Sequence, residues 1–256
     1  MNLILDDLVQ LLATGLIPFI RISAMLLSAP IVSLRVVSVR IRIALAFTLT
    51  ILIYPNLDIP ILDPTSADGI RLIVNEIMIG LIFGMVLQVV NAALVVAGQS
   101  ISMSMSLGMA QTIDPNMGRV PVVASFLVII STLIFLSVGG HLILITLILQ
   151  SFEALPMGAR IDYGATLNNL ILWAAMVFLG GVLVALPIMI SMTLINLCIG
   201  IVTRAAPALN IFAVGFPAMV LTGMLLLLVF MVNIGHRIEW LWLQAFDKAQ
   251  TLWVVP

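Results

Sequence analysis

Long apolar segments separated by short polar connectors are the feature of this sequence that most restricts its fold. A membrane-spanning helix needs about 20 mainly apolar residues, and six segments can be placed by that length. They run approximately over residues 8–34, 43–57, 70–97, 122–149, 167–202 and 218–235. The second is short for a crossing, and the third and fifth are too long for an untilted one. Pro187 predicts a kink in the fifth segment, because proline has no N–H for the helical hydrogen bond.

The composition excludes an ordinary soluble enzyme. Hydrophobic residues make up 63% of the 256 residues and charged residues only 8%, whereas soluble domains carry roughly 25% charged residues. Because so little polar surface is available, much of the apolar surface must contact lipid or other subunits. No connector is long enough to form a soluble domain, so we expect residues 1–256 to form a single helical membrane unit.

The sequence contains none of the common catalytic patterns. His141 and His236 are far apart, and neither lies in an HExxH, CxxC, GxSxG or Walker pattern. The net charge is −1, without the basic cluster that nucleic-acid binding requires. We therefore expect a protein that is not an enzyme, with no catalytic residue, no cofactor, no metal and no nucleic-acid partner.

Two charged residues, Arg21 and Glu76, lie inside the first and third apolar segments. A charge at the bilayer centre costs about 2.5–3.5 kcal/mol, so such residues usually face a protein interior or a water-filled path. One interpretation places each nearer an interface, with its charged end in water. The other pairs them, since their signs are opposite. If they pair, exchanging the two residues should restore the function that either single substitution loses.

A stripe of small and polar residues lies along one face of the third apolar segment. At steps of three or four it contains Glu76, Gly80, Gly84, Gln88, Asn91, Val95 and Gly98. Gly80 and Gly84 form a GxxxG pattern, which lets membrane helices approach closely. The stripe predicts a helix-packing surface, either within the chain or against partner subunits or a passage. Its packing residues would be Gly80, Gly84, Gln88, Asn91 and Gly98.

A segment rich in serine and methionine comes next. Serine and apolar residues alternate from Ser100 to Leu107, and a period of two is typical of an extended segment. Loop-forming glycine and proline residues follow as far as Pro121. Four methionines lie in this region, at positions 103, 105, 109 and 117, and methionine fills irregular gaps well. The composition favours a loop enclosed by protein, with a mobile interfacial loop as the alternative.

Five motifs, in the same order, resemble the FliR family of flagellar export-gate proteins, which includes the T component of virulence secretion systems. They are Arg21-x7-Ala29-Pro30-Ile31-x3-Arg35, Glu76 with Ile79-Gly80 and Ala97-Gly98-Gln99-Ser100-Ile101, Asp114-Pro115, Gly140-His141-Leu142, and Arg204 to Pro217 in the pattern R-x-x-P-x-L-[NS]-[IV]-F-x-x-G-F-P. One departure is Ser106, where many family members have glycine. Serine tolerates a positive φ poorly compared with glycine.

The resemblance implies a fold and a role. The fold would be all-α integral membrane, with about six long, partly broken helices; residues 1–165 would be similar to FliP, and residues 166–256 would form a FliQ-like part ending in a helical hairpin. The protein would belong to the flagellar type III protein export gate, in the bacterial inner membrane and basal body, displaced toward the periplasm. Its partners would be FliP and FliQ, then FlhB and FlhA, membrane lipid, and the unfolded proteins that are exported.

The resemblance also implies candidate site residues. A pore-closing loop would include Met105, Ser106, Leu107, Met109, Ile113, Asp114 and Pro115. A subunit contact would include Arg204, Pro207, Asn210, Phe212, Gly215 and Pro217. Two alternatives stay open: a gate subunit of a virulence secretion system, and a small-solute secondary transporter that uses Arg21 and Glu76 as coupling groups.

Overall fold

The computed structural model describes residues 2–30, 38–57, 59, 66–107, 121–159, 161–205 and 215–252. Over these ranges the regular secondary structure is helical, without a strand. The all-α fold expected from the sequence is therefore confirmed. The chain forms two compact units, the first from residues 1–89, 139–174 and 244–256, and the second from residues 90–138 and 175–243.

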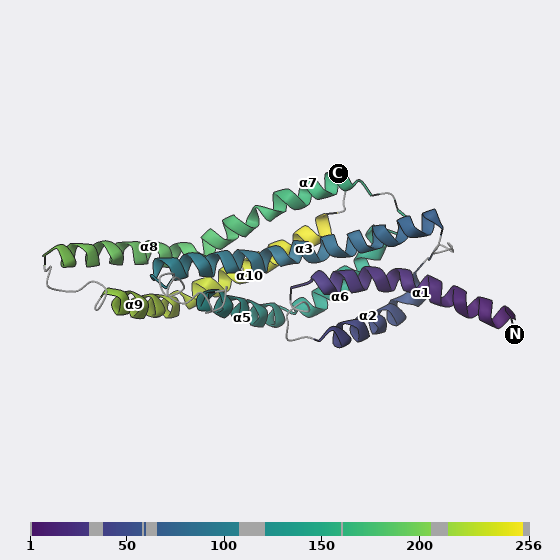
Figure 1. Ribbon diagram of the computed structural model, residues 1–256, viewed down its shortest axis with the longest axis horizontal. Helices are drawn as coiled ribbons and strands as arrows, with labels where there is room; N and C mark the ends of the chain where they lie inside the picture. Colours follow the sequence, from purple (N-terminus) through teal and green to yellow (C-terminus); the bar gives the residue numbers. More distant parts are fainter. Residues whose placement is uncertain are drawn as a thin grey trace. The chain divides into compact units, whose positions relative to one another are not determined.

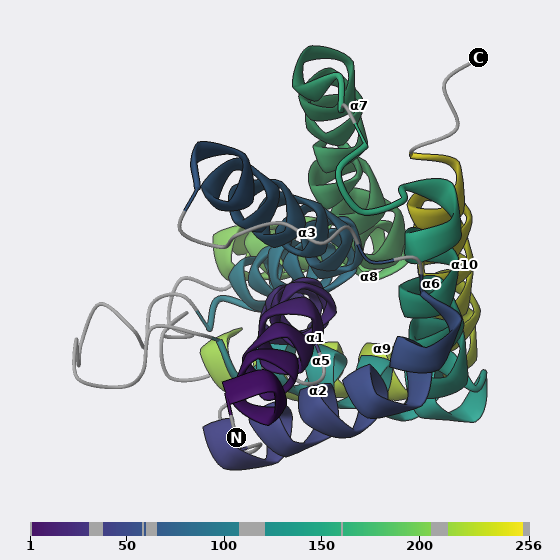
Figure 2. The ribbon, with the colours of Figure 1, turned by 90° about the vertical axis from the view of Figure 1, so that its right-hand side faces the viewer.

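Unit 1 contains two helices that lie side by side near the N-terminus, together with further helical segments (Figures 1 and 2). Its elements are α1 (Asn2–Ser28), α2 (Val39–Ile53), the 3-10 turn η1 (Tyr54–Asn56), the first part of α3 (Ala67–Ser104), α6 (Gly140–Ala154), α7 (Tyr163–Ala174) and the end of α10 (Met231–Thr251). Side-chain caps fix where three of these helices begin. Ser38, Ser66 and Asp162 each accept a backbone N–H from the first turn of α2, α3 and α7.

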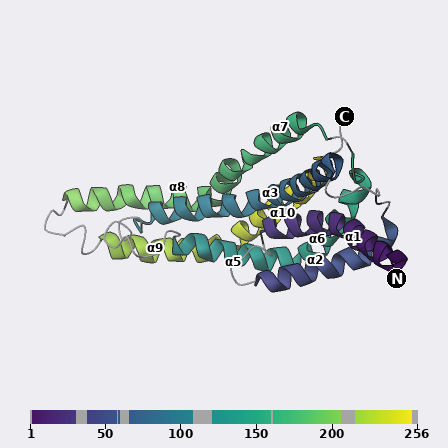
Figure 3. The same ribbon diagram turned by 45° about the vertical axis from the view of Figure 1, so that its right-hand side comes forward.

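Unit 2 is built around a pair of neighbouring helices, α8 and α9 (Figures 1 and 3). It contains the end of α3, α5 (Val122–Ser137), α8 (Met176–Ala205), α9 (Phe216–Val229) and the first part of α10 (Met231–Thr251). Trp242 lies in its core, where the indole Nε1 donates to Ser131 Oγ at 2.9 Å. The Trp242 ring meets Phe135 edge to face, with 4.7 Å between the centroids.

The apolar segments expected from the sequence are helical, and several of them are broken. Two helical stretches within the described residues are long and apolar enough to cross a membrane, Ala67–Ser104 and Tyr163–Ala205. Two bent pairs, α5 with α6 and α9 with α10, would raise that number to four. The axes of α9 and α10 differ in direction by 62°, which is a sharp bend. Partly broken membrane helices were predicted, and the structure confirms them.

Two of the apolar segments are broken at Gly139 and at Ala175. In the fourth segment the break is at Gly139, whose φ of 74° favours glycine. In the fifth segment α7 ends and α8 begins at Ala175, whereas α8 continues through Pro187. A proline that removes one helical hydrogen bond can bend a helix without ending it, so the kink at Pro187 stays a prediction.

The stretch from Ser100 to Leu107 is not extended, contrary to the prediction from its alternation. The helix α3 continues to Ser104, and Ile101 and Met105, four residues apart, are both buried. The hydroxyls of Ser100 and Ser104 donate to carbonyls of the preceding turn at 2.9 and 2.7 Å. Serine can satisfy its hydroxyl inside a helix in this way, so the alternation did not require a strand.

Candidate functional site

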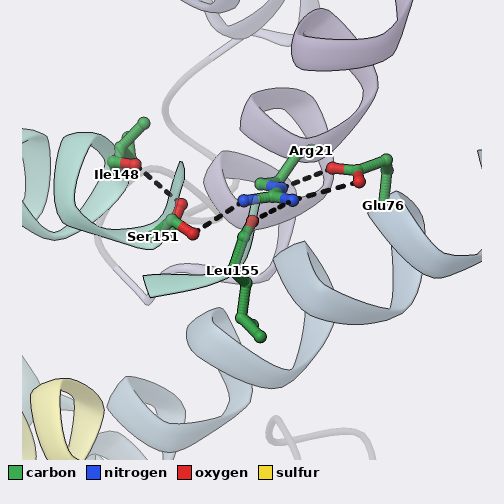
Figure 4. Close-up of polar contacts among 5 residues, drawn as sticks. All are labelled: Arg21, Glu76, Ile148, Ser151 and Leu155. Atoms are coloured by element: carbon green, nitrogen blue, oxygen red, sulfur yellow. Dashed lines mark hydrogen bonds and ion pairs between the residues drawn. The ribbon is translucent and has the colours of Figure 1, made fainter. Parts of the chain in front are cut away.

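Arg21 of α1 and Glu76 of α3 form a buried ion pair in unit 1 (Figure 4). Each side chain is 1% exposed. The guanidinium Nε donates to Glu76 Oε2, and Nη2 donates to Oε1 at 3.0 Å. This is the two-pronged arrangement in which arginine and carboxylate interact most strongly. The hypothesis that the two charges pair is confirmed, and neither side chain extends to the surface of the chain.

The C-terminal end of α6 supplies the rest of the Arg21 environment. Nη1 donates to the Ser151 carbonyl at 2.8 Å, and Nη2 donates to the Leu155 carbonyl at 2.9 Å (Figure 4). The Arg21 Cζ lies 4.3 Å from the centre of the Phe152 ring. The Leu155 carbonyl lies past the last residue of α6, and the Ser151 carbonyl accepts the Leu155 N–H as well as Arg21. Carbonyls at a helix C-terminus carry partial negative charge, so both are favourable acceptors for a cation. One guanidinium thus joins α1, α3 and α6.

These contacts give a reason to expect that exchanging the two charges does not restore what either single substitution loses. A glutamate at position 21 would present acceptor oxygens to the Ser151 and Leu155 carbonyls, which are also acceptors. It would also lose the contact between the guanidinium and the Phe152 ring. The pair is therefore directional: position 21 requires a donor with several N–H groups, and position 76 requires an acceptor.

The GxxxG glycines lie where α3 approaches α1 most closely. A Cβ added to Gly80 would lie 2.5 Å from the Arg21 carbonyl oxygen and 2.7 Å from the Ala24 Cβ. A Cβ added to Gly84 would overlap the Ser28 side chain. Small residues permit such close helix contacts in membranes. This approach brings Glu76, one turn before Gly80, within reach of Arg21.

The other stripe residues do not share that surface. Gly98 lies in unit 2 against α5, where an added Cβ would overlap Ala124. Asn91 is half-buried and Gln88 is exposed. Each step of four residues turns about 40° past a full helical turn, so Gln88 is rotated about 120° from Glu76. The stripe therefore packs in separate places within the chain, and any packing at Gln88 requires a partner.

The helix α3 ends in a Schellman motif. The Leu107 N–H donates to the Ser102 carbonyl and the Ser106 N–H donates to the Met103 carbonyl, both at 3.0 Å. Ser106 takes the left-handed position with φ of 61°, the only positive φ at a non-glycine residue in the part of the chain that the structure describes. Glycine is usual there. The departure noted in the sequence therefore falls at the residue where glycine would relieve strain.

Side-chain contacts hold this turn against α8 and α9. Met105, 1% exposed, fills the space beside Gly223, where an added Cβ would lie 2.5 Å from the methionine Cγ and Cε. Ser106 Oγ donates to Met219 Sδ at 3.4 Å. From α8, Asn196 Nδ2 donates to a carbonyl of the last α3 turn at 3.4 Å. The point from which the chain continues into residues 108–120 is thus fixed by two helices.

The structure describes part of each predicted residue set. In the predicted loop it places Met105, Ser106 and Leu107, whereas Met109, Ile113, Asp114 and Pro115 lie outside the described residues. In the predicted subunit contact, Arg204 and Pro217 are exposed and Gly215 is buried, whereas Pro207, Asn210 and Phe212 lie outside the described residues. Among the residues that are described, no group of three or more His, Cys, Asp and Glu could hold a metal ion.

Several residues of these contacts were not found from the sequence. They are Phe152, the carbonyls of Ser151 and Leu155, Asn196, Met219 and Gly223. Gly223 gave one weak signal, as a glycine inside an apolar helix, where glycine is unfavourable unless packing requires it. The carbonyl acceptors gave none, because every residue has a carbonyl.

Much apolar surface of α8 and α9 is uncovered in the chain alone. Phe178 and Ile201 of α8 are each 70% exposed, and Leu228 of α9 is 75% exposed. Apolar patches of this kind mark contact with lipid or with other proteins.

Comparison with known proteins gives a consistent result over nearly the whole chain. Residues 12–245 match the family described as "Bacterial export proteins, family 1". The chain is 34% identical over 242 residues to a protein named "Flagellar biosynthetic protein FliR" from Pectobacterium carotovorum subsp. carotovorum, covering 94% of this chain and 93% of that protein. Proteins of the same name from Escherichia coli (strain K12) and Bacillus subtilis (strain 168) are 33% and 29% identical, over 90% and 89% of this chain and 88% and 89% of theirs.

Proposed function

The chain belongs to the family described as bacterial export proteins, family 1, and from that membership we propose that it is a membrane subunit of the flagellar type III protein export gate. With FliP and FliQ it forms the channel through which unfolded flagellar proteins leave the cell, and it performs no catalysis. It resides in the bacterial inner membrane, at the flagellar basal body. The observation that carries this proposal is similarity to flagellar biosynthetic proteins along about nine-tenths of the chain.

The uncovered apolar helices support a role in an assembly. In the proposal, residues 1–165 correspond to FliP and residues 166–256 to FliQ. Exposed apolar residues at the ends of α8 and on α9, such as Phe178, Ile201 and Leu228, pack on partner subunits. The segment from Arg204 to Pro217 connects these two helices and makes subunit contacts through Pro207, Asn210 and Phe212. FlhB and FlhA are further partners, and membrane lipid covers apolar surface that no subunit covers.

The anchored end of α3 supports a loop that helps to close the channel. Met105 packs on Gly223, and the Ser106 hydroxyl donates a hydrogen bond to Met219. The segment 108–120 therefore starts from a fixed point. In the proposal, Met109, Ile113, Asp114 and Pro115 follow from this point and block the passage. Methionine suits such a plug because its flexible, polarizable side chain packs against irregular surfaces.

The buried charges support a structural role for Arg21 and Glu76 and disfavour the transporter alternative. A coupling group must reach the path of a substrate or an ion. Both side chains are only 1% exposed. The guanidinium donates its hydrogen bonds to Glu76 and to carbonyls at the end of α6, so neither group reaches such a path.

Deletion of the gene in its own host, followed by plasmid complementation, tests the proposal. We expect deletion to abolish swimming and the export of hook and filament proteins, and the parent chain to restore both. A tagged chain should copurify with FliP and FliQ. Recovery of the chain as a lone monomer or homo-oligomer, with motility unaffected by the deletion, would contradict the proposal. Loss of effector secretion while motility persists would assign the chain to a virulence system instead.

A further inference from the structure

We propose that unit 2 binds an anionic phospholipid, with its headgroup in a cavity between α8 and α10. The cavity has a volume of about 540 Å³. The wall from α10 carries polar side chains beside Ile234 and Trp240, and the wall from α8 is apolar. This inference concerns lipid recognition and does not depend on the proposed role in export.

The α10 wall offers hydrogen-bond donors for a phosphate group. Asn233, His236 and Arg237 line it at helical spacings of three and four, and all three are exposed. Arg237 has no hydrogen-bond or ion-pair partner among the described residues. A guanidinium matches the geometry of phosphate oxygens, and the histidine and amide add N–H donors. The nearest carboxylate in sequence, Glu239, lines a separate neighbouring cavity, which His236 also borders.

The α8 wall offers a place for the glycerol backbone and an acyl chain. Leu183, Leu186 and Pro187 line this side. Because Pro187 has no N–H, the Leu183 carbonyl lacks its usual helical donor and can accept from a headgroup hydroxyl. The apolar face continues along α8 through Val182 and Ile190, which are 44% and 55% exposed.

The combination of the two walls identifies the ligand class. Free phosphate would use only the polar wall, whereas a phospholipid uses the donors and the apolar strip together. Trp240 lines the same cavity and is 37% exposed, and tryptophan is enriched at the level of lipid headgroups. Basic pockets at that level commonly hold anionic headgroups. Phosphatidylglycerol, with a phosphate and two free hydroxyls, has the complementary chemistry.

Lipid titration of the intact protein, purified with its copurifying partners, tests this assignment. Native mass spectrometry would measure binding of phosphatidylglycerol and of phosphatidylcholine with identical acyl chains. Arg237→Gln should weaken phosphatidylglycerol binding about fivefold, the effect of one surface arginine on an anionic lipid. Arg71→Gln is the matched control, because Arg71 is an exposed arginine of unit 1 outside this cavity, and it should leave binding unchanged.

A second variant tests the cavity independently of its charge. Leu186→Trp should fill the space and reduce binding of phosphatidylglycerol while keeping Arg237. The proposal is overturned if the parent binds both lipids equally, if Arg237→Gln binds phosphatidylglycerol as the parent does, or if Arg71→Gln loses as much binding as Arg237→Gln. It is also overturned if inorganic phosphate binds as tightly as phosphatidylglycerol, since the apolar wall would then contribute nothing.

Discussion

Exchanging Arg21 and Glu76 is predicted to leave the protein substantially destabilised, although the exchanged pair keeps both charges. In the parent, the guanidinium donates to Glu76 and to two α6 carbonyls, and it lies over Phe152. A carboxylate at position 21 cannot donate to those carbonyls. The variant Arg21→Glu with Glu76→Arg therefore restores an ion pair and removes the connection to α6.

The size of the deficit follows from the contacts that are lost. Removing one partner of a buried pair costs about 3–5 kcal/mol, which is the expectation for Glu76→Ala. In the exchange, the Leu155 carbonyl loses its donor at about 1–3 kcal/mol, and the contact with Phe152 is lost at about 0.5–2 kcal/mol. The Ser151 carbonyl still accepts the Leu155 N–H at 3.1 Å, so its loss of Arg21 adds little to the cost. The exchange is thus expected to cost about 1.5–5 kcal/mol, close to the single substitution.

Thermal unfolding of the detergent-purified protein with its partners, together with its amount in membranes, measures this deficit. Each kcal/mol should lower the midpoint by about 2–4 °C in a chain of this size. The double variant Arg21→Met with Glu76→Met is the control: it leaves no unpaired charge and should be no less stable than the exchange. An exchange variant with the midpoint and abundance of the parent would refute the reasoning, because the α6 carbonyls and Phe152 would then contribute nothing.

Two further substitutions test the anchored end of α3. Ser106→Gly should stabilise the protein by about 1 kcal/mol, because it removes the cost of a left-handed residue with a Cβ, whereas Ser106→Ala should not; equal midpoints for the two variants would contradict this. Gly223→Ala should destabilise it by about 1–3 kcal/mol through overlap with Met105, and Met105→Ala in the same chain should recover part of the loss. Gly235→Ala, where the nearest atom to the added Cβ lies at 4.0 Å, is the matched control, and an equal loss there would contradict the role of Met105.

The sequence was sufficient to predict the elements whose physical signals are local or unusual. Two opposite charges in apolar segments gave the pairing of Arg21 with Glu76 as one of two interpretations, because each is costly alone in a membrane, and the structure selects that one. The GxxxG pattern predicted close helix approach, and the structure places Gly80 and Gly84 against α1. The resemblance to a family singled out Ser106 before its φ was known.

Other features depend on tertiary structure and could not be predicted. Arg21 can reach the Leu155 carbonyl because α6 ends at Ala154, and it shares the Ser151 carbonyl with the Leu155 N–H. The serine alternation indicated an extended segment, but hydroxyl bonds to preceding carbonyls and burial of Ile101 and Met105 favour the helix instead. The packing of Met105 on Gly223 joins residues far apart in the sequence, and neither residue type identifies its partner.

The central claim, that this chain helps to close a protein-conducting channel, is tested most directly by ion conductance. The protein would be reconstituted in planar bilayers together with the proposed partners FliP and FliQ, with and without deletion of residues 109–114. We predict that the parent assembly is closed and that the deletion conducts ions, while Arg71→Gln stays closed as the control. A deletion assembly as tight as the parent, or a parent that conducts as freely as the deletion, would contradict the account.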